Sequence, residues 1–307
     1  MSGAPLQHPI RHPSPEPGLH SSPGARGGAL LARLREPRPL ITIELRPPRA
    51  DLSHQRSIDS WVDMHHAVRR LVKADTFVFL TDNAVGQNEE ENLHHLRTNL
   101  AQAVDPARLV PFLTCKHPLD YCLMYADRAL SHGHEALTVL GGDNHVGPPR
   151  CLAHAYELRE RVRQRAPGLA LGGWANPHQD PLRQLAYLEA PDFTAEFFLT
   201  QVVSHHQLRE VEAFVEELRR RELPFPGLFG VFYYRSAHAR TLKRLAQFLP
   251  VPAAGVTRDF ESGLGPEEVC ARTVRALREV GVDKVYLSNL DFGAAPRTLR
   301  DIEDLVG

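Results

Sequence analysis

The sequence predicts a closed (β/α)8 barrel, because short apolar runs alternate with amphipathic helical segments and polar residues follow each run. About eight such runs occur, which is the number of strands that closes a barrel of this kind. They are ITIEL at 41–45, TFVFL at 76–80, LVPFL at 109–113, ALTVL at 136–140, LALGG at 169–173, AEFFL at 195–199, LFGVF at 228–232 and KVYL at 284–287. Chemistry in such barrels lies at the carboxyl ends of the strands, so the polar residues there form the candidate site.

Length and composition indicate a soluble protein with one domain. The 307 residues exceed the roughly 250 of a typical barrel by about the length of an unusual N-terminal stretch. A net charge of -1 favours neither nucleic acid nor an anionic membrane as a partner. No apolar run approaches the ~18 residues of a membrane helix. The four cysteines form no Cys-x-x-Cys pair, so we expect reduced thiols and a cytoplasmic location.

The N-terminal stretch is dense in Pro, Gly, Ser and His and lacks the apolar segment of a secretory signal. We predict a mobile tail over 1–28 and the barrel over 29–307. A short helix over 29–35 is expected to lead into the first strand and to plug the bottom of the barrel.

Helical patterns separate the runs. Residues 57–74 place one apolar stripe at spacing three and four, made of Ile58, Trp61, Val62, His65, Val68, Leu71 and Val72. Similar stripes lie at 92–104, 120–130, 151–162, 207–220, 241–249 and 267–280. Regular alternation favours parallel strands, because each crossover needs a helix of this size. A doubly wound sheet is the competing architecture, but the strand count and the absence of a Gly-x-Gly-x-x-Gly turn weigh against it.

Glu44 is the first candidate for chemistry, because it follows alternating apolar residues at the end of the first run. A carboxyl group ringed by apolar side chains has a raised pKa and can act as a general acid. The alternative is a structural ion pair with Arg46 or Arg49.

Asp143 and Gln201 end two further runs. The Gly141-Gly142 pair before Asp143 lets a ligand approach the backbone, although an ordinary Asx turn explains it equally well. The amide of Gln201 suits the edge of a heterocycle, and it could equally satisfy backbone groups at a strand end.

Trp174 and His178 lie in GGWANPH, where two glycines leave room beside a ring that could stack on an aromatic ligand. A packed rim aromatic and a surface histidine are the alternatives. The adjacent pairs His65-His66, His94-His95 and His205-His206 are expected on helices, where neighbours point apart. We therefore predict no catalytic metal.

Taken together, these motifs resemble methylenetetrahydrofolate reductase of the compact bacterial type, over about residues 38–291. The matching motifs are Glu44 in ITIELRPP, LTC at 113–115, Gly142-Asp143, WANPH at 174–178, LTQ at 199–201, FPG at 225–227 and YLSN at 286–289. The resemblance implies a barrel enzyme of one-carbon metabolism, on the route to methionine, that reduces 5,10-methylenetetrahydrofolate to 5-methyltetrahydrofolate. Its small-molecule partner would be a reduced folate, and a homo-oligomer is a further possibility.

By this resemblance Glu44 would protonate the folate and promote opening of its five-membered ring, while Asp143 and Gln201 would hold the pterin edge. The remaining candidates follow from the ends of the runs. Substrate contacts are expected from Asp143, Gln201, Tyr233 and Asn289, and cofactor contacts from Thr81, Asn83, Thr114, Gly142, Trp174 and His178.

This sequence departs from the family pattern at positions where the family binds flavin adenine dinucleotide. Gly141 replaces an arginine, Phe112 a histidine and Leu290 another arginine, and residues 186–190 replace an asparagine and a basic pair with AYLEA. A pyrophosphate needs cations or a helix N-terminus in place of its hydration. We therefore predict direct hydride transfer from NADH or NADPH without flavin. A flavin-dependent member with altered contacts and a catalytically silent folate- or partner-binding barrel stay open as alternatives. Arg235 and Arg258 are the candidates for a 2'-phosphate contact.

Overall fold

The computed structural model describes residues 28–49, 51–82, 104–143 and 147–307, which form a closed barrel of eight parallel strands in sequential order. This confirms the predicted (β/α)8 fold. The strands are β1 Leu40–Leu45, β2 Val78–Leu80, β3 Leu109–Thr114, β4 Ala136–Leu140, β5 Ala170–Ala175, β6 Phe197–Val203, β7 Gly227–Phe232 and β8 Lys284–Ser288. The ring closes between β1 and β8, where Ile43 is paired with Leu287.

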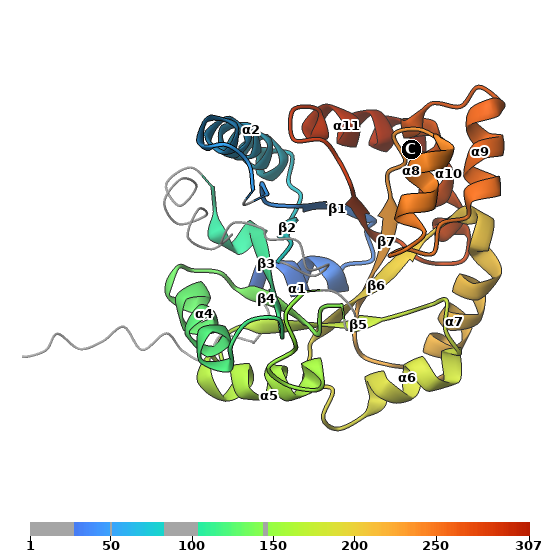
Figure 1. The fold of residues 1–307 in the computed structure, drawn as a ribbon. Helices are drawn as coiled ribbons and strands as arrows, with labels where there is room; N and C mark the ends of the chain where they lie inside the picture. The colour runs from blue at the N-terminus through green and yellow to red at the C-terminus, as the bar shows by residue number, and fades with distance from the viewer. Residues whose placement is uncertain (1–27, 50, 83–103, 144–146) are drawn as a thin grey trace, which may run out of the picture.

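Helices other than α1 surround the ring of strands (Figure 1). They are α1 Gly28–Arg35, α2 His54–Lys73, α4 Leu119–Ser131, α5 Ala155–Arg165, α6 Pro181–Glu189, α7 Leu208–Arg220, α8 Ala239–Leu245, α9 Ala253–Glu261, α10 Pro266–Glu279 and α11 Ala295–Val306, with single 3-10 turns η2 Pro106–Arg108 and η3 His205–Gln207. Of the predicted segments, residues 1–27 of the tail, most of the helix over 92–104 and Asn83 lie outside the described residues, whereas Gly28 already begins α1.

Along each strand, side chains point alternately into the interior of the barrel and into the layer between the strands and the helices. The interior holds a cluster that includes Phe79, Phe112, Phe197 and Tyr286, whereas Ile43 belongs to the outer layer. The same rule places every second residue towards the carboxyl ends inside, which gives the candidate site its inward positions.

Helix α1 lies across the centre of the ring in Figure 1 and belongs to the interior cluster. Its Leu30, Leu31 and Leu34 are 0%, 1% and 4% exposed. This confirms the prediction that the segment before the first strand plugs the barrel.

The stripe predicted for α2 is partly wrong. Trp61, Val68 and Leu71 are buried as expected, but Ile58 and Val62 are 43% and 48% exposed. Met64 and Ala67 face the barrel in their place. A helix 20 residues long turns only about a third of its surface to the strands, so a stripe that takes in every apolar residue is too wide.

Strand β6 is longer than the predicted run 195–199 and carries an irregularity against β7. Leu199 pairs with Leu228 and Val202 with Gly230, so β6 has one more residue than β7 between these pairs. This is the arrangement of a β-bulge, which re-aims side chains near the end of a strand.

Two further features concern membrane-spanning helices and the cysteines. Within the described ranges, no helix combines the length and the apolar character that a membrane crossing requires. The four cysteines are free thiols, as the sequence predicted.

Candidate functional site at the carboxyl ends of the strands

Glu44 lies at the carboxyl end of β1 and points to the inside of the barrel. Ser288 at the end of β8 donates a hydrogen bond from Oγ to Glu44 Oε1 at 2.8 Å. Both side chains are at inward positions, and the pairing of β1 with β8 brings them together. The sequence analysis predicted Glu44 as a site residue but did not predict Ser288. The two-residue period of the last strand could have identified it, because Ser288 lies two residues after the inward Tyr286.

A cavity of about 190 Å3 opens beside Glu44. Its lining combines two carboxylates, two guanidinium groups and apolar and amide side chains of the loop that follows β8: Glu44, Arg46, Arg235, Asn289, Leu290, Asp291 and Phe292. A larger cavity of about 570 Å3 lies between the start of β6 and the start of β7, at the amino ends of the strands. We place the candidate site at the smaller cavity, because barrel chemistry is carried by the carboxyl ends.

Gln201 lies at the β6 bulge. Its Oε1 accepts a hydrogen bond from Val202 N at 2.9 Å, and the neighbouring Thr200 Oγ1 accepts one from Gly230 N at 3.1 Å. These side chains satisfy backbone groups that the bulge frees, which is the alternative that the sequence left open for Gln201. Contact with a ligand stays a prediction for the amide nitrogen.

Tyr286 connects the two sides of the barrel beneath the mouth. Its hydroxyl donates to Thr200 O at 2.5 Å, and the ring is 1% exposed. Burial, followed by the charge of Glu44, raises the pKa of Tyr286 well above its usual value. A Cβ on Gly230 would lie 2.5 Å from the Tyr286 hydroxyl oxygen, so the absence of a side chain on β7 lets this ring cross the interior.

Asp143 and Gly142 follow β4, and the backbone of Gly142 has a φ of +72°, which favours glycine. The space beside the two glycines is taken by cations. Arg150 donates to Gly142 O, and a Cβ on Gly142 would lie 2.8 Å from the Lys116 side chain. Lys116 Nζ also donates to Pro148 O at 2.9 Å.

Thr81 and Thr114 are both buried at the ends of β2 and β3. Asp82 accepts hydrogen bonds from Thr114 N at 2.8 Å and Thr114 Oγ1 at 3.0 Å. His117 Nε2 lies 2.7 Å from the same carboxylate. The sequence analysis did not predict this Asp82–His117 pair, because the two residues belong to different loops.

Trp174 on β5 is partly buried against the interior cluster. The sequence suggested that the two glycines before Trp174 leave room beside its ring, but other side chains occupy that space. A Cβ on Gly172 would lie 2.6 Å from the Phe197 ring, and one on Gly173 would lie 2.5 Å from Phe193. The glycines therefore accommodate phenylalanines of the strand and loop that follow, and a stacking role for Trp174 stays a prediction.

His178 is held at both ring nitrogens. Nε2 donates to Val202 O at 2.8 Å, and Nδ1 pairs with Glu210 on α7. The ring thus joins the loop after β5 to the end of β6, and its predicted cofactor contact is not tested by this arrangement.

Tyr233 and Asn289 follow β7 and β8, and both lie at outward positions. The Tyr233 hydroxyl donates to Glu267 Oε1 on α10 at 2.6 Å, and Asn289 Nδ2 donates to Tyr233 O at 3.0 Å. Burial, followed by the bond to Glu267, raises the pKa of Tyr233. The alternation of the strand would have placed Tyr233 outside. Asn289 still borders the cavity, whereas the outward placement gives no support to a substrate contact by Tyr233.

At the positions where the resembled family binds flavin, the structure shows side chains with other contacts. Phe112 is packed in the interior cluster, and residues 186–190 cover the end of α6, where Glu189 pairs with Arg221. Lys116 and Arg150 are the cations beside Gly142, and both donate to backbone carbonyls. Phe112 and residues 186–190 therefore supply no cation for a flavin pyrophosphate, and the predicted absence of flavin is not tested by this arrangement.

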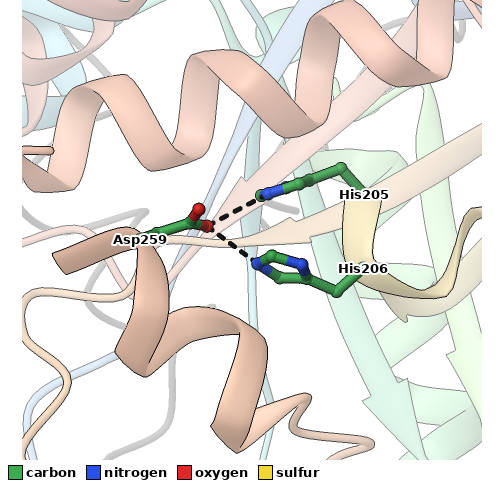
Figure 2. Close-up of side chains that lie close together, drawn as sticks. All are labelled: His205, His206 and Asp259. Carbon is green, nitrogen blue, oxygen red and sulfur yellow. Dashed lines mark hydrogen bonds and ion pairs between the residues drawn. The ribbon is translucent and has the colours of Figure 1, made fainter. Parts of the chain in front are cut away.

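His205 and His206 contradict the expectation that adjacent histidines point apart. They lie in η3, directly after β6, and both Nε2 atoms contact Asp259 Oδ2 on α9, at 3.0 Å and 2.8 Å (Figure 2). The expectation was wrong because it assumed a regular α-helix, whereas η3 is a single 3-10 turn. Tertiary contacts then direct both rings at one carboxylate.

No protein family model matches the sequence, and no curated protein matches it. Among solved structures, the fold is similar to that of a protein from Clostridium thermocellum, described as uncharacterized and as binding two copies of 5-methyl-5,6,7,8-tetrahydrofolic acid. The TM-score is 0.59 at 13% identity, and the similarity covers 87% of this chain and 96% of that one. At this identity the similarity shows a shared barrel fold.

Proposed function

We propose that this protein reduces 5,10-methylenetetrahydrofolate to 5-methyltetrahydrofolate, with the hydride supplied directly by NADH or NADPH. The observation that carries the proposal is the inward carboxyl group of Glu44, held by Ser288 beside a cavity at the carboxyl ends of the strands. The reduced folate bound by the similar barrel of Clostridium thermocellum supports the substrate class.

The chemistry assigned to Glu44 is proton delivery. A proton on the weakly basic bridging nitrogen opens the five-membered ring of the folate and leaves an electrophilic iminium at the one-carbon unit. Hydride from the nicotinamide then adds to that carbon, which becomes the methyl group, and the nicotinamide leaves oxidised. One hydride and one proton are consumed in each turnover, so no further oxidant or reductant is required.

Recognition of the substrate is divided between the two sides of the mouth. Asp143 and the amide nitrogen of Gln201 are proposed to bind the pterin edge, which presents donors and an acceptor. Arg235 is proposed to bind a carboxylate of the glutamate tail, since Leu290 replaces the arginine of the resembled family and supplies no cation. The Arg235 side chain is 51% exposed at the cavity, and its guanidinium donates to Asn289 O at 3.0 Å and lies 3.7 Å from the exposed Asp291. An exposed pair of this kind is weak, so a ligand carboxylate can replace Asp291.

Replacement of the acid tests the mechanism. We expect Glu44→Gln to abolish oxidation of NADH or NADPH in the presence of methylenetetrahydrofolate and to leave folate binding by calorimetry largely intact, because the amide keeps the shape but supplies no proton. Unchanged turnover in this variant removes Glu44 from the mechanism. Folate binding by the native protein without nicotinamide oxidation identifies a silent binding barrel instead.

The absorption spectrum tests the direct hydride transfer. Purified protein that turns over is expected to be colourless. A stoichiometric flavin chromophore would contradict direct transfer and would identify a flavin-dependent reductase with altered cofactor contacts.

Arg235→Gln tests the recognition of the tail. We expect the dissociation constant for a folate with its glutamate tail to rise about 10-fold, since a charge-assisted hydrogen bond contributes about 1.5 kcal/mol or more. A pterin without the tail should bind the variant and the native protein equally. Arg297→Gln on α11 is the matched control, because it removes the same charge at a side chain that is 82% exposed. Equal losses for both ligands would refute the assignment.

A further inference from the structure

A second cluster of side chains lies outside the cavity at Glu44. His205 and His206 come from η3, and Asp259 comes from α9, more than fifty residues later in the chain. Figure 2 shows both imidazole rings directed at the same carboxylate oxygen. The ligating atoms of the three residues all lie within 4.8 Å of one another.

The hydrogen bonds around His205 suit a metal ligand. Thr273 Oγ1 donates to Val269 O at 3.3 Å and lies 2.8 Å from His205 Nδ1, so it can accept the Nδ1 proton. In that tautomer the Nε2 atom of the ring presents its lone pair towards Asp259 Oδ2 at 3.0 Å, as a metal-binding histidine would. An outer hydrogen bond that fixes the ring of a ligating histidine in this way is a common feature of metal sites.

The surroundings hold the other two groups in place. Arg272 Nη1 donates to Asp259 Oδ1 at 3.0 Å, which leaves Oδ2 to the histidines. A Cβ on Gly255 of α9 would lie 2.4 Å from His206 Cγ, so the ring packs directly against the helix backbone. The side chains of His205, His206 and Asp259 are 12%, 17% and 7% exposed, so the cluster is shielded yet reachable from solvent.

We propose that His205, His206 and Asp259 bind a divalent transition metal ion of the zinc type, with a water molecule at the fourth position. Two imidazole nitrogens and one carboxylate oxygen form a ligand set that zinc prefers. Ligand atoms about 3.3 Å apart surround a zinc ion at bonds of about 2.0–2.1 Å, so the nitrogen–oxygen distances of 3.0 Å and 2.8 Å need to lengthen by only a few tenths of an ångström. The ion would connect the end of β6 to α9 and is separate from the proposed folate site.

Metal binding to chelator-treated protein tests this site. We expect one equivalent of Zn2+ to bind, to raise the melting temperature, and to be replaced by Co2+ with the visible absorption of a four-coordinate site. The variant His205→Gln/His206→Gln should lose this equivalent, the spectrum and the stabilisation. His65→Gln/His66→Gln on α2 is the matched control and should retain all three. Glu44→Gln should retain them as well, so this test is independent of the proposed reductase activity.

Two further variants decide the question if the double variant fails to fold. Asp259→Asn removes the anionic ligand at constant size. Gly255→Ala keeps all three ligands but displaces the His206 ring, so we expect Co2+ affinity to fall by about 10- to 100-fold, as when the support of a metal ligand is lost. The proposal is contradicted if the Co2+ spectra and affinities are unchanged in these variants. It is also contradicted if the native protein binds no equivalent of metal. Either result would show that the cluster is a hydrogen-bonded triad without a metal.

Discussion

A hydroxyl group from the opposite end of the chain contacts the carboxyl group of Glu44. Ser288 Oγ donates to Oε1 across the seam where β1 meets β8. A proton donor must be held within hydrogen-bond reach of the reacting nitrogen, so the orientation of this carboxyl group matters as much as its presence. Ser288 is thus a positioning residue for the proposed reaction.

Ser288→Ala should lower kcat about 10-fold and change KM little, because the lost hydrogen bond orients Glu44 without contacting the substrate. Ser288→Thr restores a hydroxyl at the same position and should recover most of the rate in steady-state assays. A rise in KM at unchanged kcat would indicate that Ser288 contacts the substrate instead.

At the scale of the elements, the helices were harder to predict than the strands. The sequence indicated each strand, but it gave no separate prediction for α6, α9 or α11. The missed α6 and α9 are nine residues each and begin at or after a proline, and such short segments offer few turns on which a stripe can be recognised. Helix α7, which was predicted, shows a clear apolar face in which Val211, Phe214 and Val215 are buried.

Helix α7 also carries an acid-sensitive contact. Glu217 is 11% exposed and accepts hydrogen bonds from Arg220 and Arg221, and these bonds lower its pKa to about 2. A depressed pKa contributes stability that is present above the unfolded value of about 4.5 and is lost as the pH falls towards 2. Glu217→Gln should therefore flatten the decline of the unfolding free energy over this pH range.

Urea unfolding at a series of acidic pH values measures this effect. Glu216→Gln is the control, since it removes the same charge at an exposed neighbouring position. Equal pH dependence in the two variants would show that the arginine contacts of Glu217 do not persist in solution.

At the scale of the whole molecule, the barrel is closed at its amino end by α1. Three leucines of this helix pack into the same cluster as the inward residues of the strands. The helix is fixed further by the Ala29 N–H, which donates to Glu135 Oε2 at 2.7 Å. The first described element is therefore part of the core on which the geometry of the mouth depends.

Leu31→Ala should lower the free energy of unfolding by about 2–5 kcal/mol, because it leaves a cavity inside the closed barrel. Leu305→Ala on α11 removes the same atoms from a side chain that is 39% exposed and should cost much less. Denaturant midpoints for the two variants give the comparison. Similar losses would mean that α1 does not pack inside the barrel.

The amino-acid sequence by itself determined the barrel and the carboxyl ends at which Glu44, Gln201 and Trp174 stand, because strand length and alternation are local properties of the chain. Only the tertiary structure decided which side chains meet. Ser288 reaches Glu44 across 244 residues, and Asp259 reaches His206 across 53. Closure of the ring and the packing of η3 against α9 create these contacts, and no local pattern encodes them.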